Sequence, residues 1–431
     1  MDVFARRRRR VLEQIDGVLV VPAQPLALRN NDVQHEYRQD SDVHYLAGFD
    51  EPESVLVLTT RHPKHRFVMF VRPRDPDREA WDGVRAGVDG AMGHHGADAA
   101  FPIGELAQRL PEYLTGASRL YYRLGRERAF DDALLAAVAA VRGRGRTPQT
   151  WPTEIVDPAT VVHEMRLRKD DEEIASMRRA AEITRDAHLG AMHLAAPGRW
   201  EYEIEALIRE VFRKNGSERP AYAPIVGSGP NATVLHYRTN NRKLEAGDLL
   251  LIDAGCEYDY YASDVTRTFP VNGTFSRAQR KIYETVLEAQ TAAIAAIRPG
   301  ATLEEVHDVT VSVIVAGLLS AGLLQGDPAK IIAEQSYRPY YMHRASHWIG
   351  MDVHDVGAYF ASGKPRPLEP GMVLTVEPGI YVRHNDASVP AEFRGLGVRI
   401  EDDVLVTATG AKELTGDIPK TVDDVERACR A

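Results

Sequence analysis

The chain has 431 residues, of which 44% are hydrophobic and 27% are charged, and its net charge is −9. These shares are those of a soluble globular protein, and the length predicts two or three domains rather than one core. The acidic balance argues against general nucleic-acid binding and suits a protein that holds carboxylates around metal.

The cysteine content and the hydropathy of the chain indicate where in the cell the protein is expected. Cys256 and Cys429 are the only cysteines, which favours a reducing environment over a disulfide framework. No apolar run approaches the roughly 18 residues of a membrane span, and the N-terminus lacks the apolar core of a secretory signal. The run Arg6 to Arg10 leads into the helical segment VLEQI and is interpreted as a solvated helix face rather than a nucleic-acid patch. We therefore expect a cytoplasmic protein that binds neither membranes nor nucleic acid.

An N-terminal domain is predicted from alternating strands and helices. Short apolar strands with the sequences GVLVVP, SVLVLTT, RFVMFVRP and RLYYRLG occur between Gly17 and about Arg142, together with helical segments such as Asp131 to Val141. This alternation predicts an α/β domain of modest size. A stretch rich in turn formers, GRGRTPQTWP, follows at residues 143–152, and we place the first domain at residues 1–160.

A second domain, residues 161–431, is predicted from a repeated pair of helices. Apolar periodicity predicts helices over Asp171–His193 and Glu201–Lys214, which are joined through a Pro-Gly pair. The arrangement recurs with a helix over Ser276–Ile297, a second Pro-Gly pair, and a capping-box signal at Thr302 for the next helix. The fold class is therefore α/β (α+β), with an internal duplication in the C-terminal part.

Two twelve-residue stretches support the duplication and mark a site. LEAGDLLLIDAG (Leu244 to Gly255) and LEPGMVLTVEPG (Leu368 to Gly379) each carry an acid in the same late position, Asp253 in one and Glu377 in the other. Each acid lies near the end of an apolar strand, and an unpaired buried carboxylate is costly. Matched buried acids predict two related halves that face each other across a shared cation.

Each of these strands is followed by a second acid. Ten residues separate Asp253 from Asp264, so a hairpin closed by an even-length turn would set the two acids directly opposite each other. After Glu377 the returning strand GVRIEDDVLVT places Arg399 and Glu401 on one face by strand alternation. The alternatives without a functional role are that Asp253 and Asp264 are solvent-exposed, and that Arg399 and Glu401 form a salt bridge along one strand.

Three histidines precede Glu377 within the segment HRASHWIGMDVHDVG: His343, His347 and His354. On a helix His343 and His347 would share a face, but Arg344 occupies the place of the general base of a zinc-protease HExxH helix. That disfavours a single-zinc metalloprotease. A lone histidine is more often structural, yet three within twelve residues beside acid-bearing strands are unusual.

Four carboxylates and one imidazole form the candidate metal site: Asp253, Asp264, His347, Glu377 and Glu401. Such an oxygen-rich set suits Mn²⁺ or a similar hard ion better than a lone Zn²⁺. Two divalent ions balance four negative charges, whereas one ion would leave an excess. A dinuclear site lowers the pKa of a bound water towards about 7, so hydrolysis is the expected chemistry.

The order Asp, Asp, His, Glu, Glu, with its flanking sequences, resembles a known family. NATVLHY, SHWIGMDVHDVG, TVEPGIY and RGLGVRIEDD, which begin at residues 231, 346, 375 and 394, are similar to segments of the creatinase and methionine aminopeptidase superfamily. Within it the chain most resembles the Xaa-Pro aminopeptidases, also called aminopeptidase P. The stretch from Arg29 to Leu58 resembles the first domain of that family, so the likeness covers nearly the whole chain. It implies the "pita-bread" fold.

The resemblance also implies roles for the metal ligands. Asp253 and Asp264 would ligate the first ion, and Asp264 would also reach the second. His347 and Glu377 would complete the second ion's ligands, and Glu401 would bridge both. Glu377 would also accept the proton of the attacking water. The expected cofactor is therefore two divalent ions, and the donor set favours Mn²⁺.

Four further residues receive roles from the resemblance. His354 would contact the substrate carbonyl or stabilise the tetrahedral intermediate, and His236 and His343 would line the proline-side pocket. Arg399 would orient Glu401 or help to shape the site. One departure is Arg344, because relatives often have Gly after the first His of this stretch.

The implied activity is hydrolysis of the N-terminal Xaa-Pro bond, with peptides carrying proline second as substrates. Prolidase, which shares the ligands and cleaves only Xaa-Pro dipeptides, is the first alternative. A metal-free binding module of the same fold is the second, and its expected sign, loss of ligands, is not seen in this sequence. The likeness further implies a homo-oligomer, either a dimer or a tetramer, with the first domain serving substrate access or oligomerisation.

Overall fold

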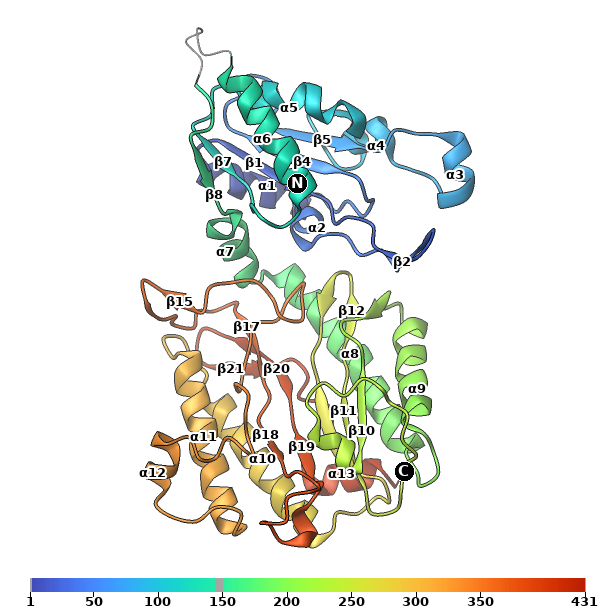
Figure 1. The fold of residues 1–431 in the computed structure, drawn as a ribbon, viewed down its shortest axis with the longest axis vertical. Helices are drawn as coiled ribbons and strands as arrows, with labels where there is room; N and C mark the ends of the chain where they lie inside the picture. Colours follow the sequence, from blue (N-terminus) through green and yellow to red (C-terminus); the bar gives the residue numbers. More distant parts are fainter. Residues whose placement is uncertain (1, 144–149, 431) are drawn as a thin grey trace. The chain divides into compact units, whose positions relative to one another are not determined.

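The computed structural model describes residues 2–143 and 150–430, and it divides the chain into two compact units, Met1–Met165 and Arg166–Ala431 (Figure 1). Part of the turn-rich stretch at 143–152 lies outside the described residues. No helix among the described residues is long and apolar enough to cross a membrane.

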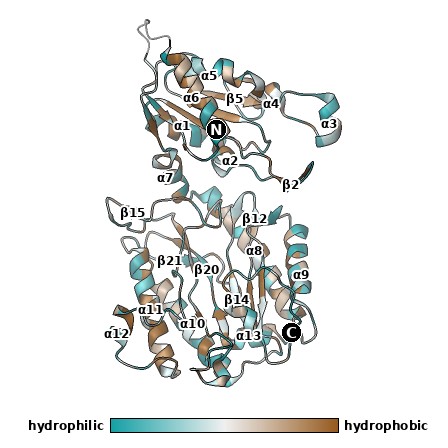
Figure 2. Cartoon of the chain, in the orientation of Figure 1, coloured by the Kyte–Doolittle hydropathy of each residue, from teal (hydrophilic) through white to brown (hydrophobic). Residues whose placement is uncertain are grey.

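A six-stranded mixed sheet forms the centre of the first unit, in the order β6-β5-β4-β1-β7-β8. Its strands are β1 (Val18–Pro22), β4 (Val55–Thr59), β5 (Phe67–Val71), β6 (Ala99–Pro102), β7 (Arg119–Tyr121) and β8 (Glu154–Val156). A short hairpin, β2 (Leu28–Asn30) and β3 (Val33–Gln34), lies outside this sheet. β4 and β5 are buried along their whole length, which explains their continuous apolar sequences, and β5 is strongly hydrophobic in Figure 2.

Helices complete the first unit. They are α1 (Val3–Gln14), α2 (Ser41–Ala47), α3 (Pro76–Asp82), α4 (Gly87–Gly93), α5 (Leu106–Leu114) and α6 (Arg128–Arg142), with short 3₁₀ turns at Ile103–Glu105 and Pro158–Thr160. Leu134, Ala137 and Val141 of α6 are buried in the same hydrophobic cluster as β1, β4 and β5. The chain then passes into the second unit within α7 (Val162–Leu167).

The predicted solvated face of α1 is wrong for two of its arginines. Arg7 and Arg8 are buried, with their guanidinium carbons 4.0 Å above the Tyr45 ring and 4.2 Å above the Phe67 ring. Arg8 also donates to the carbonyl of Leu46 at 2.8 Å. Cation–π contacts and carbonyl acceptors replace water around these two charges, and a charge run does not reveal such partners.

The first half of the second unit contains two helices followed by strands. The helices are α8 (Asp171–Leu194) and α9 (Glu201–Lys214); the strands are β9 (Arg219–Pro220), β10 (Ile225–Ser228), β11 (Leu249–Asp253), β12 (Cys256–Tyr258), β13 (Tyr261–Ala262) and β14 (Thr266–Pro270), with a 3₁₀ turn at Gly229–Thr233. β11 is the centre of an antiparallel sheet with β10 and β14. The buried faces of α8 and α9 share one hydrophobic cluster with β11.

The second half repeats this order. Its helices are α10 (Arg277–Ala296), α11 (Leu303–Ser320) and α12 (Pro328–Ala333). Its strands are β15 (Phe360–Ala361), β16 (Lys364–Pro365), β17 (Val373–Val376), β18 (Gly379–Tyr381), β19 (Gly397–Arg399), β20 (Asp402–Val406) and β21 (Ala411–Glu413), with a 3₁₀ turn at Ala391–Phe393 and a last helix, α13 (Val422–Ala428). Within this unit the strands lie between the pair α8 and α9 and the pair α10 and α11 (Figure 1).

Matching glycines begin the two repeated strands. Gly247 and Gly371 have φ angles of +93° and +89°, a backbone conformation that residues with a Cβ rarely adopt. Each therefore makes the turn that brings the chain into β11 or β17. The two strands end at Asp253 and one residue before Glu377, so equivalent backbone geometry delivers the two acids.

The predicted fold class, α/β with duplicated helix pairs, is confirmed by these elements. The capping box predicted at Thr302 is present, because its hydroxyl accepts from the amide of Glu305 at 3.2 Å. The predicted pairing of Asp253 with Asp264 is wrong: Asp253 lies opposite Thr266 in the β11–β14 ladder. The inserted hairpin β12–β13 shifts the register by two residues, which keeps the acids on one side although they are not direct partners.

Candidate active site

A cavity of about 840 Å³ lies in the second unit. All nine residues proposed from the sequence line it: His236, Asp253, Asp264, His343, His347, His354, Glu377, Arg399 and Glu401. The structure therefore brings together side chains that are up to 165 positions apart, from His236 to Glu401, in one site.

The two aspartates come from the first half. Asp253 is the last residue of β11, and its carboxylate accepts from the Tyr222 hydroxyl at 2.6 Å and from the Arg399 guanidinium at 2.7 Å. Asp264 precedes β14, and its amide donates to a carboxylate oxygen of Asp403 at 3.0 Å. Both aspartates are buried, so their charges need these partners or a cation.

The two glutamates come from the second half. Glu377 follows β17, and its amide donates to the carbonyl of Ala345 at 2.9 Å. Glu401 lies between β19 and β20, and its carboxylate accepts from the Thr266 hydroxyl at 2.6 Å. The equivalent strands of the two halves thus each end at the cavity with an acid.

His347 lies in an extended segment rather than on the helix considered from its spacing with His343. This segment runs beside β17, where Trp348 forms a bridge with Leu374. Nδ1 of His347 lies 3.0 Å from the Trp348 carbonyl, which leaves Nε2 directed at Asp264 and Glu377, at 3.4 and 3.5 Å. A backbone acceptor on one ring nitrogen is the usual arrangement of a histidine whose other nitrogen binds metal.

Asp264, His347 and Glu401 offer ligand atoms that lie within 4.8 Å of one another. Asp253 and Glu377 are outside this compact group but line the same cavity. The donor set fits a divalent cation, because a group of buried carboxylates with one imidazole is unfavourable without positive charge between them.

The electrostatics of the acids show the same need for a cation. Burial, reinforced by Asp264, raises the pKa of Glu377 to about 7, although His347 opposes the shift. Burial and the neighbouring carboxylates raise the pKa of Glu401 well above its usual value. Burial also raises the pKa of Asp253, and Arg399 limits that rise. Like charges packed together in a dry site produce this pattern.

His347 has the opposite shift. Burial alone lowers the pKa of its imidazole, but the hydrogen bond to Asp264 and the charge of Glu377 raise the pKa to about 9. The neighbouring carboxylates therefore stabilise the positive charge of the protonated imidazole.

Arg399 contacts Asp253 rather than the carboxylate of Glu401. Its three nitrogens donate to Asp253, to the Thr266 hydroxyl at 2.9 Å and to the Tyr381 hydroxyl at 2.9 Å. Thr266 in turn donates to Glu401, so Arg399 reaches Glu401 through one hydroxyl. The expected orienting contact is thus indirect.

The remaining histidines surround the acids. Nε2 of His343 lies 3.0 Å from the Tyr381 hydroxyl, and burial together with Arg399 lowers its pKa to about 3, so this imidazole is neutral. The ring of His354 packs edge-on against that of His347 at 4.5 Å, and burial together with His347 lowers its pKa. His236 is exposed at the cavity on the loop after β10.

Sequence reasoning missed several residues of the site. Tyr222, Thr266, Tyr381 and Asp403 bind the predicted acids or arginine, and Leu235, Arg238, Glu304 and His307 line the cavity. The second aspartate of the IEDD motif was a usable signal for Asp403, since it directly follows Glu401-Asp402. The tyrosines carry no such signal, because their partners are distant in sequence.

Comparison with known proteins defines the class. The family model described as "Metallopeptidase family M24" matches residues 175–408, and "Aminopeptidase P, N-terminal domain" matches residues 4–121. The Xaa-Pro aminopeptidase of Escherichia coli (strain K12) is 45% identical over 427 residues, covering 98% of this chain and 96% of the relative.

Two solved structures are similar to this chain over nearly its whole length and are also aminopeptidases. The structure of Pseudomonas aeruginosa aminopeptidase PepP superimposes with a TM-score of 0.97 at 49% identity, covering 99% of this chain and 97% of that chain. Zn-substituted E. coli aminopeptidase P in complex with product gives a TM-score of 0.95 at 44% identity, covering 99% and 98%.

The two units and the acid-lined cavity are thus those of a metallopeptidase that uses divalent metal. The chain belongs to metallopeptidase family M24 and, within it, to the Xaa-Pro aminopeptidases of the pita-bread fold, the family that the sequence resembles.

Proposed function

We propose that this enzyme hydrolyses the first peptide bond of peptides with proline in the second position and releases the N-terminal residue. One observation carries the proposal: Asp264, His347 and Glu401 converge within 4.8 Å in the cavity of a chain that is 45% identical to an Xaa-Pro aminopeptidase. The same comparisons favour this activity over that of a prolidase.

Two divalent ions, best matched by Mn²⁺, would be held by the five predicted ligands. Asp253 and Asp264 would hold one ion, and Asp264 would also reach the second. His347 and Glu377 would complete the second ion's ligands, and Glu401 would hold both. Two divalent ions would neutralise the four negative charges of these carboxylates. The ions would lower the pKa of water and polarise the scissile carbonyl.

The protein side chains then handle protons and orientation. Glu377, a buried carboxylate beside His347, would accept a proton from water and return it to the leaving nitrogen. His354 would donate to the carbonyl oxygen as negative charge develops there. Arg399 would hold Asp253 in place.

The prolyl ring would lie between His236 and His343, which both line the cavity. The bond before proline is a tertiary amide without N–H, and the ring restricts the residue before it. A site for this bond must therefore recognise the ring itself rather than a strand-like backbone. The neutral imidazole of His343 suits packing against an apolar ring.

The test compares a tripeptide Xaa-Pro-Xaa with the dipeptide Xaa-Pro, with and without Mn²⁺. Release of the first residue from the tripeptide in the presence of Mn²⁺ supports the proposal. Cleavage of the dipeptide without cleavage of the tripeptide would instead indicate a prolidase. Glu377→Gln, which keeps the size of the side chain but removes its basicity, is the matched inactive control.

The domain roles and the setting of the enzyme belong to the same proposal. Residues 1–160 would control substrate access or oligomerisation, and residues 161–431 would carry catalysis in a dimer or tetramer. Burial raises the pKa of Cys256 to about 11 and of Cys429 to about 12, so both thiols stay protonated, which suits the reducing cytoplasm.

A further inference from the structure

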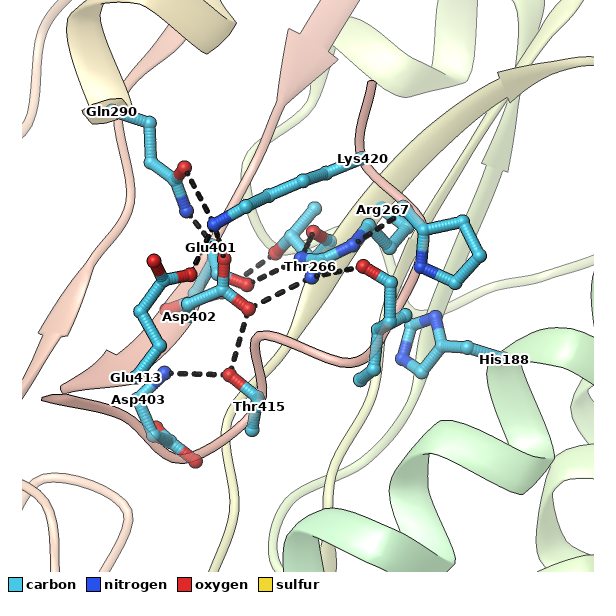
Figure 3. Close-up of polar contacts among 12 residues, drawn as sticks. His188, Thr266, Arg267, Gln290, Glu401, Asp402, Asp403, Glu413, Thr415 and Lys420 are labelled. Carbon is cyan, nitrogen blue, oxygen red and sulfur yellow. Dashed lines mark hydrogen bonds and ion pairs between the residues drawn. The ribbon is translucent and has the colours of Figure 1, made fainter. Parts of the chain in front are cut away.

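Glu401 also belongs to a second polar network, whose central charged pair, Arg267 and Asp402, is not among the residues that line the cavity (Figure 3). Glu401 directs its carboxylate at the cavity, whereas the next residue, Asp402, directs its own carboxylate away from it, as expected for neighbours in an extended chain. Asp402 meets Arg267, which follows Thr266 on β14, and both charged groups are fully buried.

Arg267 uses all five of its N–H donors. Nε donates to the carbonyl of Pro419 at 3.0 Å, one terminal nitrogen to those of Thr266 and Glu401 at 3.0 and 2.6 Å, and the other to Asp402 and the carbonyl of Ile418 at 2.7 and 3.1 Å. A guanidinium has five donors in a fixed plane, so this set is complete.

Asp402 is equally saturated. One oxygen accepts from Arg267 and from the Thr415 hydroxyl, each at 2.7 Å, and the other from the Gln290 amide at 2.6 Å and the Lys420 ammonium at 2.8 Å. Four hydrogen bonds fill the lone pairs of a carboxylate. The partners come from α10, from β14 and from the segment after β21, so one side chain joins three parts of the unit.

A buried ion pair is a weak source of stability, because the desolvation of two charges offsets most of their attraction. The role of the Arg267–Asp402 pair is therefore better judged from the groups that it holds in place than from its contribution to stability. Two of the five acceptors of Arg267 are the carbonyls of Thr266 and Glu401, and these two residues also bind each other. The amide of Glu401 donates to the Thr266 carbonyl at 3.1 Å, and the Thr266 hydroxyl donates to the Glu401 carboxylate at 2.6 Å.

This arrangement joins the two halves of the unit at the metal site. Thr266 belongs to β14 in the first half and Glu401 precedes β20 in the second. Arg267 holds the backbone of both, so the distance between the halves is fixed where the ligands Asp264 and Glu401 must share an ion. A second link, from the amide of Asp264 to Asp403, closes the same junction.

We propose that Arg267 and Asp402 are positioning residues that set the affinity of the site for divalent metal by fixing the Glu401 carboxylate against Asp264. This inference rests on the proposed metal centre. The planar guanidinium of Arg267 donates to the backbone carbonyls of Thr266 and Glu401 and so fixes their separation. Asp402 binds the same guanidinium and fixes its orientation.

The test titrates the full-length, metal-stripped enzyme with Mn²⁺ by isothermal titration calorimetry. Arg267→Lys keeps the charge but cannot reach five acceptors, and Asp402→Asn keeps the shape but puts N–H groups towards its donors. Both variants should bind Mn²⁺ about 10–100-fold more weakly than the unmodified enzyme, the usual effect of losing a group that orients metal ligands.

Asp248→Asn is the matched control. Asp248 also pairs with an arginine, Arg242, at 2.5 Å, but it precedes β11, five residues and about 16 Å of strand from Asp253. Its Mn²⁺ affinity should stay within about threefold of the unmodified enzyme. A purely electrostatic role would leave Arg267→Lys unchanged and would overturn the proposal, as would equal losses in Asp248→Asn.

Lys420→Met extends the test to a variant that folds readily, because Lys420 is 17% exposed and Asp402 keeps its other three partners. We expect Lys420→Met to bind Mn²⁺ about three- to tenfold more weakly than the unmodified enzyme. If Arg267→Lys and Asp402→Asn do not fold, an unchanged affinity of Lys420→Met would contradict the proposal. Absence of Mn²⁺ binding by the unmodified enzyme would refute the metal centre itself, an outcome distinct from equal binding by all variants.

Discussion

Two of the proposed metal ligands, His347 and Glu377, carry protons that compete with a metal ion for the site. His347, with a pKa of about 9, is protonated at pH 7, and Glu377, with a pKa of about 7, is half protonated. Both groups must lose their protons to ligate a cation, so metal binding and proton release are linked.

We therefore predict that Mn²⁺ affinity rises with pH. Raising the pH from 6.5 to 8.5 first deprotonates Glu377 and then approaches the pKa of His347, so each step removes a competing proton. The affinity should increase by about tenfold per proton released and per pH unit. Calorimetry in buffers of different ionisation enthalpy counts the protons directly. A pH-independent affinity with no proton release would contradict the assignment of these two ligands.

Arg344, directly after His343, is an exposed cation at the cavity. It forms an ion pair with Glu304, and both side chains line the cavity while 55% and 38% exposed. Exposed ion pairs contribute about 0–1 kcal/mol to stability. The pair is therefore suited to set the charge of the cavity rim rather than to hold the fold together.

For Arg344→Gly we predict unchanged folding but altered substrate preference. Removal of the guanidinium leaves Glu304 as an unpaired negative charge, so peptides with an acidic residue after proline should show a KM raised about threefold, and peptides with a basic residue a lowered one. The kcat/KM ratio for Xaa-Pro-Asp against Xaa-Pro-Lys measures the change. A double variant that also carries Glu304→Gln should restore the ratio, and failure to do so would contradict a charge effect.

At the scale of elements, Glu201 on α9 controls the loop that carries His236. The buried carboxylate accepts five hydrogen bonds from that loop: from Ser228 N and Oγ at 2.7 Å each, Asn231 Nδ2 at 3.1 Å, Tyr237 Oη at 2.8 Å and Arg242 N at 2.8 Å. An acceptor-only group is required here, because all five partners donate. The Asn and Tyr of the NATVLHY motif thus serve the shape of the loop.

Glu201→Gln should accordingly impair substrate binding more than catalysis. An amide N–H would face donors of the loop, at a cost of about 1–3 kcal/mol. We expect KM for Xaa-Pro tripeptides to rise at least about fivefold, with kcat and Mn²⁺ affinity changed by less than about threefold. Glu203→Gln, in the same helical turn but bonded only to Trp200 and Arg199, is the control. Equal effects in both variants would contradict the role of Glu201.

Elements with local signals could be predicted from the sequence, whereas their junctions could not. The helix over Glu201–Lys214 has the predicted bounds, because its apolar stripe and its end at Asn215-Gly216 are local. The offset of Asp264 depended on the β12–β13 hairpin, whose pairing no local pattern reveals. His347 lines the cavity but was considered on a helix, since spacing alone does not distinguish a helix from a segment that pairs with β17.

At the scale of the whole molecule, the site depends on contacts of long sequence separation. Four of the five acceptors of Arg267 lie 134 to 152 positions away, and Arg399 binds Asp253 across 146 positions. The acids were predictable because burying them requires a cation, which is a chemical constraint visible in the sequence. Arg399 was predicted from its place two residues before Glu401, whereas Arg267 was not, because its partners are distant in sequence and any of the many arginines could have filled that role.

Since the ligands come from both halves of the second unit, metal binding should stabilise that unit. Ions that bind only the folded state add about 2.7 kcal/mol at a free concentration 100-fold above Kd, which corresponds to roughly 5–10 °C in Tm. Calorimetry with Mn²⁺ and then with a chelator measures this shift. The four acids repel one another in the metal-free site, so the gain in stability should be concentrated there.

Hydrogen exchange can locate the gain. Amides of β11, β14, β17 and β20 should gain protection on Mn²⁺ addition, because these strands deliver the acids from both halves. Amides of the first unit, which contributes none of the five proposed ligands, should exchange at unchanged rates. Protection confined to one half would indicate an ion held by that half alone. Such a result would contradict a centre shared through Glu401, since a bridging ligand must order both sheets together.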